Sequence, residues 1–97
     1  MAKAQIGCCS LELHLPEVTS LKGKRGILKS LLTRVRNQFN VSAAEIGHQD
    51  LWQSSGIAVV CVSNSQAHCH QMLQSVVRWI EDSYPEVQII AEEMEML

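Results

Sequence analysis

The chain has 97 residues, of which 46% are hydrophobic and 19% charged, and this composition predicts one folded domain over residues 1–97 and excludes a disordered chain. The formal net charge is only −2, but residues 1–49 carry seven bases and three acids whereas residues 50–97 carry one base and seven acids. The longest purely apolar run, 57–62, is too short to cross a bilayer, and no secretory signal precedes it, so we expect a cytoplasmic protein.

The first half of the chain predicts a strand, a helix and a second strand. Apolar and polar residues alternate over 5–15, which is typical of a half-buried strand, and Pro16 ends it. Ser20 is a suitable N-cap for a helix that runs to about Gln38, because leucines recur along one side at steps of three and four residues. The second strand is expected over 40–47.

The second half of the chain predicts a strand, a helix and a last strand. The segment GIAVVCV at 56–62 is apolar at almost every position, which is typical of a central strand. The sequence SNS at 63–65 supplies an N-cap for a helix through about Ser83, and EVQIIAEEMEM at 86–96 follows. This order predicts an α+β, ferredoxin-like βαββαβ sandwich: a four-stranded antiparallel sheet with two helices on one face.

The connection between the second and third strands reads EIGHQDLWQ at 45–53 and contains a histidine, an aspartate and one of the two tryptophans. In the predicted topology this hairpin, the turn after the first strand and the exit of the second helix lie at the same end of the sheet. We therefore expect the hairpin to stand beside the start of the first helix.

Basic residues gather on one flank of that helix. At about 100° per residue, four of its basic side chains fall within about 60° of one another. Beside them, His48 and Trp52 of the hairpin could stack on unpaired nucleobases of a nucleic acid. The predicted nucleic-acid-binding residues are Lys22, Lys24, Arg25, Lys29, Arg36, His48 and Trp52. For Trp52 we slightly favour the alternative that it folds over the open end of the core, because tryptophan is usually mostly buried.

We predict no metal and no cofactor. On an extended strand Glu45 and His48 face opposite sides of the sheet, so they do not converge on one ion. On a helix His68 and His70 stand about 200° apart, whereas helical zinc pairs need an i,i+4 spacing. The cysteines Cys8, Cys9, Cys61 and Cys69 form no CxxC pair, and we interpret them as small hydrophobic residues in a reducing compartment.

We also expect no catalytic residues. The loop after the first strand, PEVTSLKGKR, contains Glu17 and has its glycine only after the helix has begun, so it is a poor phosphate cradle. No cysteine or serine has an evident base beside it in the sequence. A small phosphate-ester or acyl-phosphate enzyme is therefore the least favoured function.

The segments LELHLP (11–16), SLKGKR (20–25), LLTRVRNQFNVSAAEIGHQDLWQ (31–53) and AVVCVSN (58–64) closely resemble the YlxP-like family of small bacterial proteins. The resemblance covers nearly the whole chain, and EIGHQDLWQ is its most specific part. It implies the ferredoxin-like fold and a bacterial origin, and it implies no established activity. Members are commonly encoded beside translation initiation factor two and ribosome-binding factor A, which favours a role linked to RNA or the ribosome.

The face of the sheet away from the helices is expected to be apolar. We expect it to carry Cys8 and Ser10, some of Ile57, Val59 and Cys61, and part of Ile89 or Ile90. A homodimer through this face is therefore a further prediction. Two functions stay open: a non-catalytic RNA- or ribosome-binding protein of ribosome maturation or translation, and a homo-oligomeric protein-interaction adaptor without nucleic-acid binding.

Overall fold

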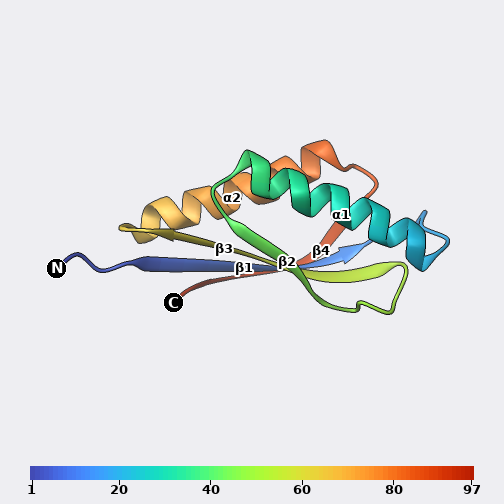
Figure 1. Cartoon of the computed structure of the whole chain (residues 1–97), viewed down its shortest axis with the longest axis horizontal. Coiled ribbons are helices and arrows are strands. Elements are labelled where there is room, and N and C mark those ends of the chain that lie inside the picture. The colour runs from blue at the N-terminus through green and yellow to red at the C-terminus, as the bar shows by residue number, and fades with distance from the viewer.

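A computed structural model describes all 97 residues and shows two helices packed on one face of a four-stranded sheet (Figure 1). The elements are β1 (Gln5–His14), α1 (Leu21–Gln38), β2 (Ser42–Gly47), β3 (Ser54–Ser63), α2 (Gln66–Ser83) and β4 (Gln88–Met96). The strands lie in the order β2-β3-β1-β4, and every neighbouring pair is antiparallel. The predicted α+β, ferredoxin-like βαββαβ arrangement is confirmed.

Both helices begin where the sequence predicts. The Ser20 hydroxyl accepts a hydrogen bond of 2.9 Å from the Gly23 N–H, and the Ser65 hydroxyl accepts one of 3.3 Å from the His68 N–H. These caps satisfy backbone donors that have no partner inside the helix. Neither helix has the length and hydrophobicity that a membrane-spanning segment needs.

The core lies between the helices and the inner face of the sheet. Alternate residues of β1 and β3 point into it, as do the apolar stripes of α1 and α2. The buried side chains at its centre include Leu11, Leu13, Leu31, Val35, Ile57, Val59, Leu73 and Ile80. Since each helix contributes one apolar stripe, its opposite side stays in solvent.

The open face of the sheet, away from the helices, differs from the prediction in its β3 residues. Ile57, Val59 and Cys61 are all buried in the core. The β1–β3 register sets Ala58, Val60 and Val62 opposite Ser10, Cys8 and Ile6, so these three residues form the β3 part of the open face. Strand β3 is apolar on both faces, and its sequence alone therefore could not identify the core side. The open face is nevertheless apolar, because Val62 is 61% and Ile6 39% exposed.

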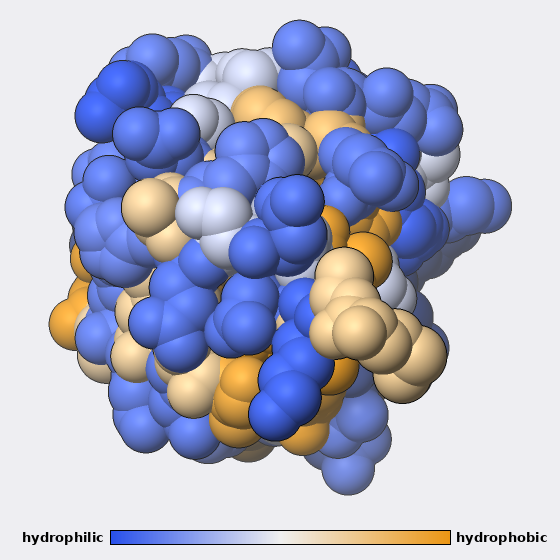
Figure 2. Space-filling view, turned by 90° about the vertical axis from the view of Figure 1, so that its left-hand side faces the viewer, coloured by the Kyte–Doolittle hydropathy of each residue, from blue (hydrophilic) through white to orange (hydrophobic).

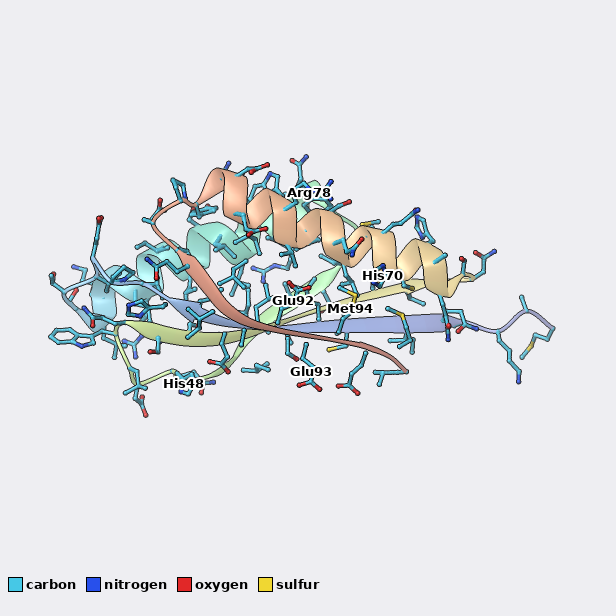
Figure 3. The ribbon with its side chains drawn as sticks, turned by 180° about the vertical axis from the view of Figure 1, so that it is seen from behind. His48, His70, Arg78, Glu92, Glu93 and Met94 are labelled. Atoms are coloured by element: carbon cyan, nitrogen blue, oxygen red, sulfur yellow. The ribbon has the colours of Figure 1, made fainter.

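The two ends of the sheet have different roles. The end of β1, the start of α1, the β2–β3 hairpin and the exit of α2 gather at one end, which confirms the predicted position of the hairpin (Figure 1). Both chain termini and the start of α2 lie toward the other end. Figure 3 shows His48 of the hairpin on the open side of the sheet, together with Glu93 of β4.

Candidate functional site

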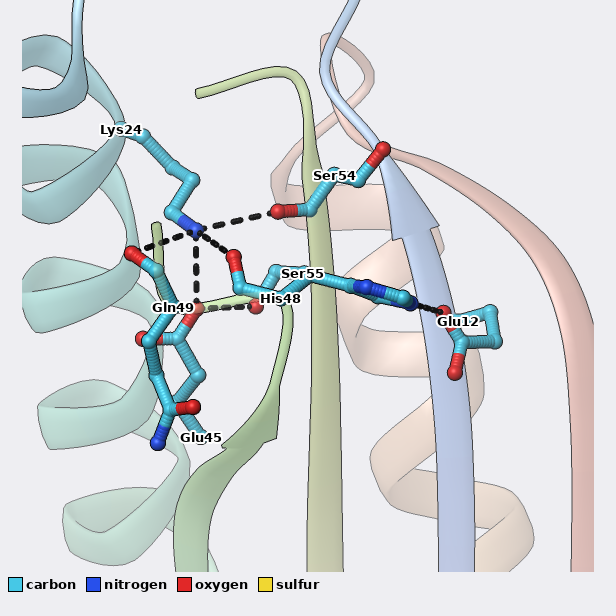
Figure 4. A network of polar contacts seen from close by, with 7 residues as sticks. All are labelled: Glu12, Lys24, Glu45, His48, Gln49, Ser54 and Ser55. Atoms are coloured by element: carbon cyan, nitrogen blue, oxygen red, sulfur yellow. Dashed lines mark hydrogen bonds and ion pairs between the residues drawn. The ribbon is translucent and has the colours of Figure 1, made fainter. Parts of the chain in front are cut away.

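Lys24 is the centre of a polar network that joins α1 to the hairpin (Figure 4). Its Nζ donates hydrogen bonds to the backbone oxygens of His48 at 2.7 Å, Ser54 at 3.0 Å and Gln49 at 3.5 Å. The same nitrogen lies 3.1 Å from Oε2 of Glu45, and the lysine side chain is fully buried. All donors of this ammonium group therefore point into the protein.

This burial corrects the prediction that Lys24 contacts phosphates. Lys24 stands four positions before Leu28 and seven before Leu31, so it lies on the core side of α1 with those two leucines. This helical spacing was a signal that could have shown that Lys24 faces the core, unlike the other basic side chains of α1. The carbonyl groups that surround its ammonium come from the hairpin, and no local sequence pattern shows them.

The Glu45 carboxylate is satisfied from two sides. Besides Lys24, the hydroxyl of the buried Ser55 donates to Glu45 Oε2 at 2.7 Å. A buried ammonium group is tolerated in a protein only when an opposite charge and further acceptors surround it. Here one carboxylate and three carbonyl oxygens do so, which fixes the shape of the hairpin against α1.

His48 holds the hairpin from the open side of the sheet. It is the one non-glycine residue with a positive φ, 58°, and its carbonyl also accepts a hydrogen bond of 3.1 Å from the Leu51 N–H. Its Nε2 lies 3.0 Å from Oε2 of Glu12, which projects from β1 on the open face (Figure 4). Glu45 and His48 thus lie on opposite sides of the sheet, as predicted, but the register shift between Glu45 and Gly47 and the positive φ of His48 set the direction of the ring, because the segment is not extended throughout.

Gln53 ties the hairpin to the turn between β1 and α1. Its Nε2 donates to the carbonyl oxygens of Pro16 at 3.2 Å and Val18 at 3.1 Å, and its own carbonyl accepts from the Leu15 N–H at 2.9 Å. No pattern in the sequence indicated the structural roles of Gln53 and Glu12. Only the expected proximity of the two turns could have pointed to Gln53, since neither residue belongs to a recognisable motif.

The tip of the hairpin presents two apolar side chains to solvent. Leu51 and Trp52 are each 51% exposed. Our preference for a Trp52 that covers the core was therefore wrong. Leu15 and Val18, both buried, already close the core at this end of the sheet, so the tryptophan is not needed there.

The basic flank of α1, defined here as Lys22, Arg25, Lys29 and Arg36, is exposed along its whole length. Arg36 donates to the Ala43 carbonyl oxygen at 2.9 Å, which places this flank beside the edge strand β2. The only ion pairs within 4.0 Å in the chain are Lys24–Glu45 and His48–Glu12. No carboxylate therefore neutralises the four bases of the flank.

Acidic residues concentrate on the opposite edge of the sheet. Strand β4 is the other edge strand and carries the exposed residues Glu92, Glu93 and Glu95. Glu93 and Glu95 are paired in register with Ser10 and Cys8, which turns them toward the open face. The uneven charge of the sequence thus becomes a basic edge at α1 and β2 and an acidic edge at β4.

Comparisons of the sequence with known proteins give a family match over most of the chain. Residues 6–94 match the family described as "Protein of unknown function (DUF503)". The chain is 45% identical over 83 residues to the "Uncharacterized protein YlxP" of Bacillus subtilis (strain 168), an alignment that covers 86% of this chain and 89% of that protein.

Comparisons with solved structures give similar folds at low sequence identity. The de novo designed protein Foldit4 aligns with a TM-score of 0.54 and 12% identity over 96% of both chains. A C-terminal segment of the alpha subunit of aIF2 from Pyrococcus abyssi aligns with a TM-score of 0.53 and 13% identity, over 97% of this chain and 49% of that one. At such identities the likeness shows the fold alone.

Proposed function

The chain belongs to the DUF503 family of proteins of unknown function, and for this member we propose non-catalytic binding of structured RNA or of a ribosomal surface, in ribosome maturation or translation. The observation that carries the proposal is the half-exposed Trp52 on a fixed hairpin, beside the lysine and arginine side chains of the basic flank, which have no carboxylate partner. A flat aromatic ring next to several free cations is the combination that binds unpaired nucleotides.

The basic flank supplies the attraction for phosphates. Lys22, Arg25 and Lys29 are exposed on successive turns of α1 and have no carboxylate partner. Each lysine or arginine that neutralises a phosphate releases condensed counterions, so the affinity for RNA falls as the salt concentration rises. Lys24 is not part of this surface because its ammonium group is buried.

The hairpin supplies contacts to the nucleobases of the RNA. The indole of Trp52 offers a stacking surface, and the half-exposed ring of His48 lies on the same hairpin. Stacking of a base on an aromatic side chain contributes about 1–3 kcal/mol. Because Lys24, Glu12 and Gln53 already fix the hairpin, little backbone order has to be gained on binding.

The test is co-sedimentation with ribosomes and with ribosomal RNA at a low and a high salt concentration. We expect wild-type chain in the pellet at low salt and a large loss at high salt. Lys22→Glu should weaken co-sedimentation and Lys22→Glu/Arg25→Glu should abolish it, whereas Trp52→Ala should weaken it about tenfold while keeping the salt dependence. The matched control is Arg78→Glu, which reverses an exposed base on α2 and should bind as wild type does.

Two results would contradict this function. One is a wild-type chain that stays in the supernatant even at low salt. The other is an Arg78→Glu variant that loses as much binding as Lys22→Glu, because net charge rather than the basic flank would then govern the attraction. Binding to ribosomes that is lost in Trp52→Ala but insensitive to salt would indicate a protein contact instead.

One observation favours a second candidate, a homo-oligomeric adaptor. The exposed Val62 and Ile6 lie opposite each other, one pair from the end of the β1–β3 ladder, and form an apolar area on the open face. A second copy would remove this area from water. Equilibrium sedimentation tests the idea: Val62→Lys should convert dimers into monomers, and a wild-type chain that is monomeric at all concentrations would exclude it.

A further inference from the structure

Two of the four cysteines meet inside the protein, at the end of the sheet that carries the chain termini. Cys61 lies near the end of β3 and faces the core, and Cys69 lies in the first turns of α2. The Cys61 thiol donates to the Cys69 carbonyl oxygen at 3.6 Å, and the Cys69 thiol donates to the Gln5 carbonyl oxygen at 3.6 Å. Both cysteines are buried, and neither forms a disulfide.

The two thiols are direct neighbours. Burial raises the pKa of the Cys61 thiol to about 11, and a side-chain hydrogen bond with Cys69 acts in the same direction. Cys61 therefore holds its proton at neutral pH and is a poor nucleophile toward oxidants. A ligand that binds here has to displace a proton from sulfur, which a strongly thiophilic metal ion does.

A third sulfur-containing side chain reaches the same place because Gly7 has no side chain. Gly7 of β1 is paired with Cys61 across one ladder and with Met96 across the other. A Cβ on Gly7 would lie 3.1 Å from Cys69 Cβ and 3.3 Å from Met96 Cε. The Cys69 side chain and the methyl end of Met96 thus meet over Gly7, whose neighbour across the other ladder is Cys61.

A pocket reaches Cys61 from solvent. Strand β2 is shorter than β3, and the ladder between them stops at the pair Ser42–Val60, one residue before Cys61. At that corner a pocket of about 400 Å³ opens between Ile6, Val41, Val62 and Cys61. Figure 2 views this end of the molecule and shows hydrophobic atoms exposed between hydrophilic ones. Cys61 is therefore the buried thiol that a small ion would reach first.

We propose that Cys61, Cys69 and Met96 form a binding site for copper(I). Thiolate and thioether sulfur are the ligands that a soft monovalent ion prefers over oxygen. Structural zinc sites almost always have four ligands from cysteine, histidine or carboxylate, and no group of three such residues that could hold a metal occurs in the chain. The three-sulfur cluster thus fits copper(I) better than zinc.

The binding step involves no change of oxidation state. The S–H bonds of Cys61 and Cys69 break, two copper–sulfur bonds form, and both protons pass to the buffer. The Met96 sulfur adds a lone pair without losing a proton. The occupied site carries one negative charge, and the pocket at the end of β2 is its entry path. This site is separate from the hairpin and the basic flank, so it does not depend on the proposed RNA binding.

The experiment is an anaerobic titration of the reduced chain with copper(I) in the presence of a competing copper(I) chelator. We expect uptake of one ion per chain, release of two protons per ion, and sulfur-only coordination by X-ray absorption. Cys61→Ala and Cys69→Ala should each lower the affinity at least about 100-fold, and Met96→Leu about tenfold. The matched control is Cys8→Ala, since Cys8 lies on the open face opposite Val60 and should bind as wild type does.

Thermal unfolding of the copper-free variants checks that they fold. If a variant does not fold, the proton release and the X-ray absorption spectrum of the wild type still test the site. The proposal is overturned if the wild type takes up no copper(I) against the chelator. It is also overturned if uptake releases fewer than two protons, or if Cys8→Ala reduces the affinity as much as Cys61→Ala.

Discussion

The ammonium group of Lys24 lies 3.1 Å from the Glu45 carboxylate, with the lysine side chain fully buried and the glutamate side chain 20% exposed. The pair adds nothing to the surface charge of the protein. Its role is to hold the hairpin against α1, together with the carbonyl groups of His48 and Ser54. In such a network each member depends on all the others being present.

Replacing Lys24 by methionine should lower the free energy of unfolding by about 3–5 kcal/mol, because it leaves Glu45 and several buried carbonyl groups without their donor. Urea denaturation measures this loss. Lys22→Met is the control: Lys22 is exposed and unpaired, so its replacement should change stability by less than about 0.5 kcal/mol. Similar losses in both variants would show that the buried network does not stabilise the fold.

Gly7→Ala should destabilise the protein by about 1–3 kcal/mol through overpacking. The added Cβ would lie only 3.0 Å from Leu73 Cδ1 and 3.1 Å from Cys69 Cβ, so α2 would have to move away from the sheet. Gly26→Ala is the matched comparison, because no atom lies within 4 Å of its added Cβ. That change should raise stability by roughly 1 kcal/mol through better helix propensity. Thermal unfolding should show shifts of opposite sign, and two shifts of equal sign would refute the packing argument.

Stability should decline as the pH rises from 9.0 to about 11. Burial raises the pKa of Cys9 and Cys61 from 9.0 to about 11, and for Cys9 the nearby Glu92 charge adds to the effect. Between these values the unfolded chain loses thiol protons that the folded chain retains, so the contribution is fully present below 9.0 and is lost as the pH rises through 11. For Cys9 it amounts to on the order of 3 kcal/mol, and for Cys61 it has the same sign.

Urea midpoints measured across this pH range test the decline. Cys61→Ala removes one of the two thiols, so its stability should fall less steeply over the same range than that of the wild type. Equal slopes for the two chains would mean that Cys61 ionises alike in the folded and unfolded states.

Arg34→Met should destabilise the protein by about 1–2 kcal/mol. The guanidinium carbon of Arg34 lies 5.1 Å from the ring centre of Trp79 and 5.2 Å from that of Tyr84, and Nη1 donates to the Tyr84 hydroxyl at 3.0 Å. Arg78→Met, on the exposed side of α2, serves as the control and should have little effect. The difference between the two unfolding free energies measures the interaction, and a difference near zero would argue against it.

The secondary structure could be predicted because its signals are local. Ser20 and Ser65 cap the helices through hydroxyls that bond within three residues, and the alternation over 5–15 reflects the period of a half-buried strand. The faces of β3 could not be predicted in this way. Its nearly continuous apolar sequence fits either orientation, and only the pairing with β1 selects one.

The position of the candidate site was predicted correctly, but the burial of two of its side chains was not. Topology correctly put the hairpin beside α1, yet the burial of Lys24 depends on carbonyl groups that the hairpin brings to it. Similarly, the exposure of Trp52 follows from Leu15 and Val18, which close the core before the tryptophan is needed. Both outcomes depend on contacts between distant parts of the chain, which periodicity and propensity do not describe.

His48 connects the two faces of the sheet within one residue. Its carbonyl accepts from the buried Lys24 on the helix side, and its ring contacts Glu12 on the open side. A second copy that covered the open face from Ile6 as far as Glu12 would contact this ring and would therefore act on the residue that anchors the hairpin beside the basic flank. By thermodynamic linkage, RNA binding and self-association would then change each other's affinity by the same factor. Glu12→Gln, which weakens the contact between the His48 ring and β1, should bring that factor closer to one.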